Sequence, residues 1–140
     1  MPEQRCARRY IEIEIPGREP LRIHHVALDF NDTVAADGKR VGGVGARIAG
    51  LATRVKVVVM TADTFGTARR ACARLPVAVH VVRSGAEERR LVESLGRTGV
   101  AVVGNGANDV PMFKAARLGV AVCGAEGVSA SLLRAATLRR

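Results

Sequence analysis

Three short polar clusters carry the side chains of this sequence that could do chemistry. They are DFNDT at 29–33, TADT at 61–64 and GNGAND at 104–109. Carboxylate oxygens are the ligands that hard cations such as Mg²⁺ prefer, and hydroxyl and backbone N–H groups can hold a phosphate. Asp29 and Asp109 are therefore candidate metal ligands, and Thr61 is a candidate phosphate ligand.

Each cluster directly follows an apolar run that is typical of a buried strand. Strands are predicted at 10–15, 21–30, 55–60, 77–82, 100–104 and 119–123, and helices at 44–53, 64–74, 86–95, 108–117 and 127–136. Repeated strand–helix units predict an α/β fold with a doubly wound (Rossmann-like), mainly parallel sheet flanked by helices. Because ligands gather at the carboxyl ends of such strands, we expect the three clusters to share one crevice.

The first two strands are predicted to form an N-terminal β-hairpin, because the PGREP segment between them is typical of a turn. Between Asp29 and Thr61 the pattern leaves room for only a short turn and one helix. Two side chains inside apolar runs, His80 and Cys123, are expected to be buried.

The composition fits one domain over residues 1–140, because 48% of the 140 residues are hydrophobic and disorder is not expected. The net charge of +9 comes mostly from scattered arginines without interleaved aromatic residues, so binding of nucleic acid is a third, less favoured function. The three cysteines lack metal-ligand spacing, and the sequence has neither a signal segment nor an apolar run long enough for a bilayer. We expect a cytoplasmic protein without a membrane partner.

Two stretches carry a resemblance to a known family. VVVMTADTFGTARRACARL and VAVVGNGANDVPMFKAARLGVAV resemble the phosphorylation domain of P-type ATPases, within the haloacid dehalogenase-like (HAD) superfamily. With the cluster at Asp29, the likeness covers about residues 24–136. It implies covalent catalysis, in which a carboxylate accepts the phosphoryl group and a cation neutralises the phosphoryl oxygens.

The resemblance assigns a role to each cluster residue. It implies that Asp29 is the nucleophile and also binds Mg²⁺, and that Asn31 offers its backbone carbonyl to the metal. It implies that Thr61 hydrogen-bonds the transferring phosphoryl group, with the neighbouring backbone at Ala62. The remaining implied residues are the metal ligand Asp109, the second loop position Asn105 and the supporting residue Asn108.

Two amides depart from the family pattern. Phosphatases of the family usually carry an aspartate where this sequence has Asn31. An amide cannot exchange a proton at neutral pH, so acid–base help typically worth about 10²–10⁴-fold is lost. Asp32 follows it, but alternation along an extended segment would turn its side chain the other way. Asn105 replaces a frequent aspartate, and one negative charge fewer should weaken Mg²⁺ binding.

The third departure is at the position where the family has a lysine that binds the phosphoryl group. The spacing of that position to the apolar residues that follow it, here Val92 and Leu95, identifies it as Glu88, which has the opposite charge. The basic residues that could replace it are Arg89, Arg83 and, less favoured, Lys114, and Arg89 is taken as the catalytic candidate.

The sequence therefore favours two functions over the binding of nucleic acid. The first is a slow Mg²⁺-dependent phosphatase or hydrolase that acts on phosphate esters or anhydrides through a phosphoaspartate on Asp29. The alternative is a degenerate HAD-like domain that binds phosphate, nucleotide or a protein partner without turnover. No cap domain fits between the clusters, so we expect an open site that a second subunit could cover. The expected substrate is a phosphorylated small molecule or protein.

Overall fold

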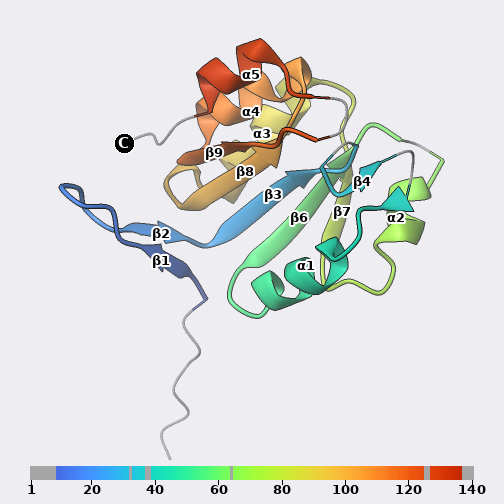
Figure 1. The fold of residues 1–140 in the computed structure, drawn as a ribbon, viewed down its shortest axis with the longest axis horizontal. Helices are drawn as coiled ribbons and strands as arrows, with labels where there is room; N and C mark the ends of the chain where they lie inside the picture. The colour runs from blue at the N-terminus through green and yellow to red at the C-terminus, as the bar shows by residue number, and fades with distance from the viewer. Residues whose placement is uncertain (1–8, 32, 37–38, 64, 125–126, 137–140) are drawn as a thin grey trace, which may run out of the picture.

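A central five-stranded parallel sheet organises the molecule (Figure 1). The structure is a computed structural model, and it describes residues 9–31, 33–36, 39–63, 65–124 and 127–136. The strand order is β7 (Ala78–Val81), β6 (Lys56–Thr61), β3 (His25–Asp29), β8 (Val100–Gly104) and β9 (Leu118–Ala121). The strand that ends in Asp29 therefore lies in the centre, paired in parallel with β6 and β8.

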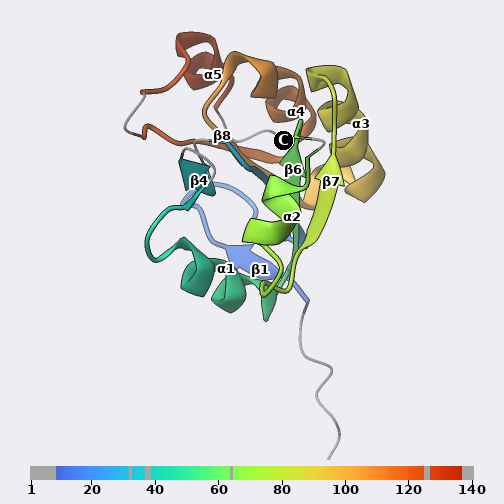
Figure 2. The same cartoon turned by 90° about the vertical axis from the view of Figure 1, so that its right-hand side faces the viewer.

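Helices cover both faces of this sheet (Figures 1 and 2). One face carries α1 (Val44–Ala52) and α2 (Thr67–Ala71), and the other carries α3 (Gly85–Leu95), α4 (Val110–Ala115) and α5 (Ala130–Ala135). Alternate side chains of β6 pack into two separate hydrophobic cores, one on each face of the sheet. Val59 lies in the first core and Met60 in the second. The predicted doubly wound α/β fold is confirmed.

The predicted N-terminal hairpin is also present, as β1 (Ile11–Ile13) and β2 (Leu21–Ile23) in a sheet of their own. The predicted strand 21–30 divides at His24, because β2 pairs with β1 whereas β3 belongs to the parallel sheet. The hairpin is attached to the first core through Ile23, which is 2% exposed.

Other elements differ from the sequence prediction. A second small hairpin, β4 (Ala35–Ala36) and β5 (Lys39–Arg40), follows β3 where only a turn and a helix were expected. His80 is exposed because β7 is an edge strand, and Cys123 is exposed because β9 already ends at Ala121. Short 3₁₀ turns, η1 (Arg97–Gly99) and η2 (Ala107–Asp109), precede β8 and α4. No helix among the described residues is both long and apolar enough to cross a membrane.

Candidate functional site

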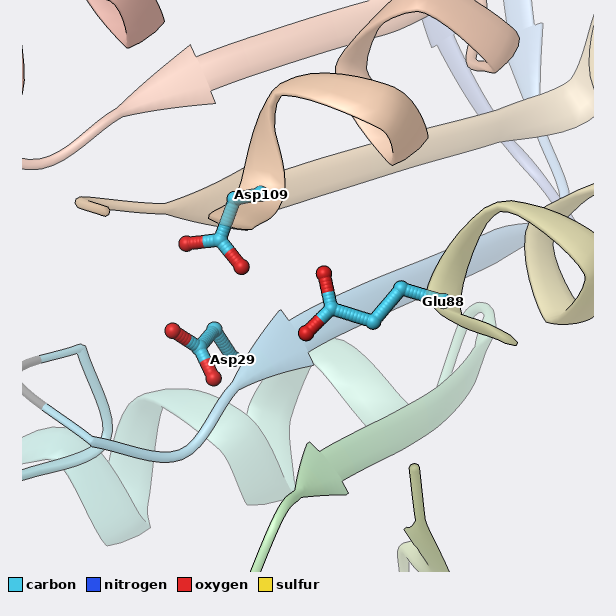
Figure 3. A group of neighbouring side chains, drawn as sticks. All are labelled: Asp29, Glu88 and Asp109. Atoms are coloured by element: carbon cyan, nitrogen blue, oxygen red, sulfur yellow. The ribbon is translucent and has the colours of Figure 1, made fainter. Parts of the chain in front are cut away.

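Three buried carboxyl groups meet at the carboxyl edge of the sheet (Figure 3). They belong to Asp29 at the end of β3, Asp109 in η2, and Glu88 on α3. One oxygen from each lies within 4.8 Å of the other two. Three elements that are distant in sequence thus bring three acids to one point.

Asp29 is positioned by the central strand. It is the last residue of β3 and pairs in register with Met60 of β6, and the next N–H, that of Phe30, donates to the Met60 carbonyl at 2.9 Å. The residues on either side are in the core: Leu28 is 7% exposed and Phe30 is 1% exposed. The Asp29 backbone is therefore fixed, and its side chain, 9% exposed, reaches the edge where ligands bind in parallel sheets.

Asp109 is held by the loop that follows β8. Its Oδ2 accepts the backbone N–H groups of Asn105 and Gly106, both at 3.2 Å, and its side chain is completely buried. Gly104 is needed for this arrangement, because a Cβ at that position would collide with the Asp109 carboxylate. Apart from the Glu88 carboxyl group, no described residue offers a hydrogen bond to Oδ1, so this atom is available to a ligand.

Glu88 lies on the inner face of α3, one turn before the buried Val92. The helix begins at a Ser84 cap, whose Oγ accepts the N–H of Glu87. Its first residue, Gly85, packs so closely on the Asp109 loop that a Cβ there would lie 2.6 Å from the Asn108 carbonyl oxygen. This close approach carries Glu88 to the other two acids. Oε2 of Glu88 is buried and, within the part of the chain that the structure describes, has no partner outside the carboxyl cluster.

Burial raises the pKa of Glu88 to about 9, and the negative charge of Asp109, a hydrogen bond of the Glu88 carboxyl group with Asp109 and the charge of Asp29 add to the effect. No ion pair between a basic side chain and Glu88 or Asp109 is present among the described residues. Without a bound cation, Glu88 is therefore protonated at neutral pH. A cation at the cluster would favour the ionised form instead.

Thr61 ends the neighbouring strand β6 and is 2% exposed. Its Oγ1 accepts the N–H of Asp63 at 3.0 Å, which leaves its own proton available for a phosphate oxygen. Asp63 accepts the N–H groups of Phe65 and Thr67, and the Phe65 bond is the main cause of its lowered pKa. Asp63 thus orders the start of α2, whereas Thr64, at which the sequence predicted the helix to begin, lies outside the described residues.

The other predicted residues line the same loops. Asn31 is exposed and forms a β-bridge with Ala35. The half-buried Asn105 donates its N–H to Asp109, and its carbonyl accepts the N–H of Ser129 at 2.9 Å. The exposed residues Ala62 and Asn108 lie on the second and third loops, and Asp32 is outside the described residues.

The basic candidates are placed differently from one another. Arg89 was the predicted replacement for the family lysine, but its guanidinium is exposed and donates to Glu93 at 2.9 Å. One residue along a helix turns a side chain by about 100°, so Arg89 leaves the inner face that Glu88 occupies. Lys114 is exposed on α4. Arg83 is exposed and directly follows Val82, whose N–H donates to the Thr61 carbonyl, so its backbone lies beside the end of β6.

This donor set fits a hard divalent cation. Each residue of the cluster offers a carboxylate oxygen, and Oε2 of Glu88 and Oδ1 of Asp109 are buried without a hydrogen bond from any described residue outside the cluster. Sequence reasoning placed Glu88 at the lysine position but did not include it among the site residues. The sequence feature that could have identified Glu88 as a buried site residue is its spacing of about one helical turn from Val92, which is buried on the same face of the helix.

Comparisons with known proteins agree with this fold. No protein-family model and no curated protein sequence matches the chain. A HAD family hydrolase from Streptomyces avermitilis matches with a TM-score of 0.63 and 21% identity, over 81% of this chain and 73% of its own. The cobalt-bound deoxy-D-mannose-octulosonate 8-phosphate phosphatase from Haemophilus influenzae matches with a TM-score of 0.59 and 19% identity, over 76% and 75%. These two likenesses show the fold.

The P-type ATPase resemblance has a structural counterpart as well. A zinc-transporting PIB-type ATPase in its E2.Pi state matches with a TM-score of 0.62 and 27% identity, over 70% of this chain. The chain spans only 16% of the length of that transporter. The structural neighbours of this chain are therefore HAD family hydrolases, including the corresponding region of a P-type ATPase, and the family resemblance expected from its motifs is confirmed at the level of the fold.

Proposed function

We propose that this chain is a Mg²⁺-dependent phosphoryl-transfer enzyme that uses Asp29 as its nucleophile. The observation that carries the proposal is the meeting of the Asp29 and Asp109 carboxylates at the sheet edge, beside the strand that ends in Thr61. A nucleophilic carboxylate, a second carboxylate for a cation and a hydroxyl for the phosphoryl group are the parts that this chemistry needs. The phosphatase and hydrolase neighbours support the same reaction class.

The proposed reaction has two steps. A carboxylate oxygen of Asp29 bonds to phosphorus as the bond to the leaving oxygen breaks, and the Thr61 hydroxyl donates a hydrogen bond to a phosphoryl oxygen. Water then attacks phosphorus, breaks its bond to Asp29 and releases phosphate. Mg²⁺, held by Asp29, Asp109 and the Asn31 carbonyl, would supply charge neutralisation.

The residue at 31 determines how fast these steps are. The exposed amide of Asn31 cannot protonate a leaving group or accept a proton from water. We therefore expect slow hydrolysis of alkyl phosphates and faster reaction of aryl or acyl phosphates, whose leaving groups need least protonation.

The alternative function is binding of a phosphate, a nucleotide or a protein partner without turnover. A specific observation favours it: Glu88 is buried at the position where the family resemblance implies a lysine, so the site lacks that lysine's attraction for phosphate. Under this alternative the fold and the metal would remain while Asp29 stays unmodified.

Phosphorylation of Asp29 separates the two functions. The full chain is incubated with Mg²⁺ and acetyl phosphate, and the acyl phosphate is detected by intact mass and by its loss in hydroxylamine. The proposed function predicts modification of wild type and none of Asp29→Asn, together with Mg²⁺-dependent hydrolysis of p-nitrophenyl phosphate that Asp29→Asn abolishes. Hydrolysis that survives Asp29→Asn would refute it, and bound beryllium fluoride or phosphate without modification would favour the binding function.

A further inference from the structure

We infer that Glu88 is a metal ligand in its own right, and that this site binds a divalent cation through three carboxylates without needing phosphate. The inference rests on the proposed function only for the place of the metal. It differs in the ligand set and in what recruits the ion, because a lysine at this position would repel a cation whereas Glu88 attracts one.

The spacing of the oxygens fits such a site. Three oxygens within 4.8 Å of one another can share a centre no more than about 2.8 Å from each, since that is the distance from centre to corner of an equilateral triangle with 4.8 Å sides. Ca²⁺–oxygen distances are about 2.3–2.6 Å and Mg²⁺–oxygen distances about 2.0–2.1 Å. Small side-chain rotations would therefore complete the coordination, with water in the remaining positions.

The buried oxygens of Glu88 and Asp109 supply a second, independent observation. Glu88 is 4% exposed and Asp109 is fully buried, and no other described residue donates a hydrogen bond to Oε2 of the first or Oδ1 of the second. Figure 3 shows both carboxyl groups turned toward each other and toward Asp29. Without a cation the two groups share the proton of Glu88, and a cation between these oxygens would replace that proton and satisfy both buried carboxylates.

Backbone contacts around the cluster position the Asp109 and Glu88 carboxylates for metal binding. Two N–H groups fix Oδ2 of Asp109, which leaves Oδ1 as its ligand atom. The contact of Gly85 with Asn108 sets the position of α3, and therefore the reach of Glu88. Backbone contacts thus restrict where these carboxylates lie, which lowers the entropy cost of binding an ion.

The negative charge of the three carboxylates favours a small metal ion that binds independently of phosphate. Three ionised carboxylates exceed the charge of one divalent cation, so the occupied site would carry a net negative charge and would repel a phosphate dianion. The metal is consequently retained without an anion, and anions bind more weakly than they would beside a basic residue.

Binding of Mn²⁺ to the full chain tests this inference. The protein is stripped of metal, placed in phosphate-free buffer, and titrated with Mn²⁺ while free Mn²⁺ is measured by electron paramagnetic resonance. Wild type should bind one ion. Glu88→Gln should raise the Kd by about ten-fold or more, whereas Glu93→Gln, which removes an exposed acid from the same helix, should leave the Kd within about two-fold.

A second variant covers the case in which Glu88→Gln fails to fold. Glu88→Lys should abolish Mn²⁺ binding without phosphate and should strengthen binding of beryllium fluoride in the presence of Mg²⁺. Failure of wild type to bind Mn²⁺, or equal Kd values for wild type and a folded Glu88 variant, would overturn the inference. Because Asp29 phosphorylation is measured separately, metal binding through Glu88 can be established even if phosphoryl transfer is refuted, and the reverse also holds.

Discussion

The carboxyl groups of Glu88 and Asp109 face each other inside the protein, and each has one buried oxygen that receives no hydrogen bond from any other described residue. Two acids so close cannot both ionise cheaply in the absence of a cation, and burial raises the pKa of Glu88 to about 9. The metal-free fold is therefore built around a protonated glutamate.

The first prediction is a pH-dependent stability of the metal-free protein. The pKa of Glu88 rises from 4.5 to about 9 on folding, so between these values the folded state holds a proton that the unfolded state has lost. The free energy of unfolding should then fall as pH rises from about 5 to 9, by at most about 1.4 kcal/mol per pH unit. Glu88→Gln should remove this slope. Urea unfolding in EDTA measures it, and parallel pH profiles for the two proteins would contradict the prediction.

A second prediction concerns the basic residue that holds the phosphoryl group. Arg83 follows the strand residue whose N–H donates to the Thr61 carbonyl, whereas Arg89 pairs with Glu93. We therefore expect Arg83→Gln to raise the KM for p-nitrophenyl phosphate several-fold, with a smaller effect on Mn²⁺ binding. The exposed Arg90 of α3 supplies the control, since Arg90→Gln makes the same change of charge. A larger effect of Arg89→Gln than of Arg83→Gln would restore Arg89 as the catalytic candidate.

The sequence was sufficient to place the parallel sheet and three of its loops. The runs that end at Asp29, Thr61 and Gly104 are continuous and apolar because both faces of a central parallel strand are covered. The end of each apolar run also marks where a loop begins. The sequence alone therefore predicts that the three loops lie together at one edge of the sheet.

Other features depend on tertiary contacts that local patterns do not encode. Glu88 is one acid among several on a polar helix, and its burial follows from the packing of Gly85 on Asn108. His80 lies in an apolar run, but its exposure follows from the edge position of β7, which only the strand order reveals. The β4–β5 hairpin has two residues in each strand, too few for a periodic signal.

The third prediction uses the close contact at Gly104. Gly104→Ala would push its methyl group into the Asp109 carboxylate and displace Oδ2 from the two N–H groups that hold it. We expect Mn²⁺ affinity to fall by about ten-fold or more and phosphatase activity to fall with it. Gly50→Ala in α1 is the matched control, because a Cβ there meets open space. It should leave metal binding unchanged and stabilise the helix by about 0.5–1 kcal/mol. Equal Mn²⁺ affinities for the two variants would contradict the role given to Gly104.

The fourth prediction adds a charge beside the metal. Asn105 is half-buried in the loop that carries Asp109, and its own N–H holds that carboxylate. Asn105→Asp should lower the Mg²⁺ concentration needed for half-maximal activity, with less effect at saturating Mg²⁺, because it strengthens metal binding rather than the chemical step. A Mg²⁺ titration of p-nitrophenyl phosphate hydrolysis measures both quantities. An unchanged half-saturating concentration would place Asn105 outside the metal's reach.

The last prediction restores the missing acid–base group. Asn31 is exposed in the loop that follows Asp29, so an aspartate there would be in contact with water. If the amide limits hydrolysis, Asn31→Asp should raise kcat by about one to three orders of magnitude at saturating Mg²⁺, less than the full range because Glu88 still occupies the lysine position. Asn31→Ser removes the amide without adding an acid and should give no gain.

The effects of Asn31→Asp and Asn105→Asp need not add, because both would act through the charge of one metal. A double variant that is no faster than wild type at any Mg²⁺ concentration would show that the amides do not limit the site, and binding without turnover would then become the better account of this protein.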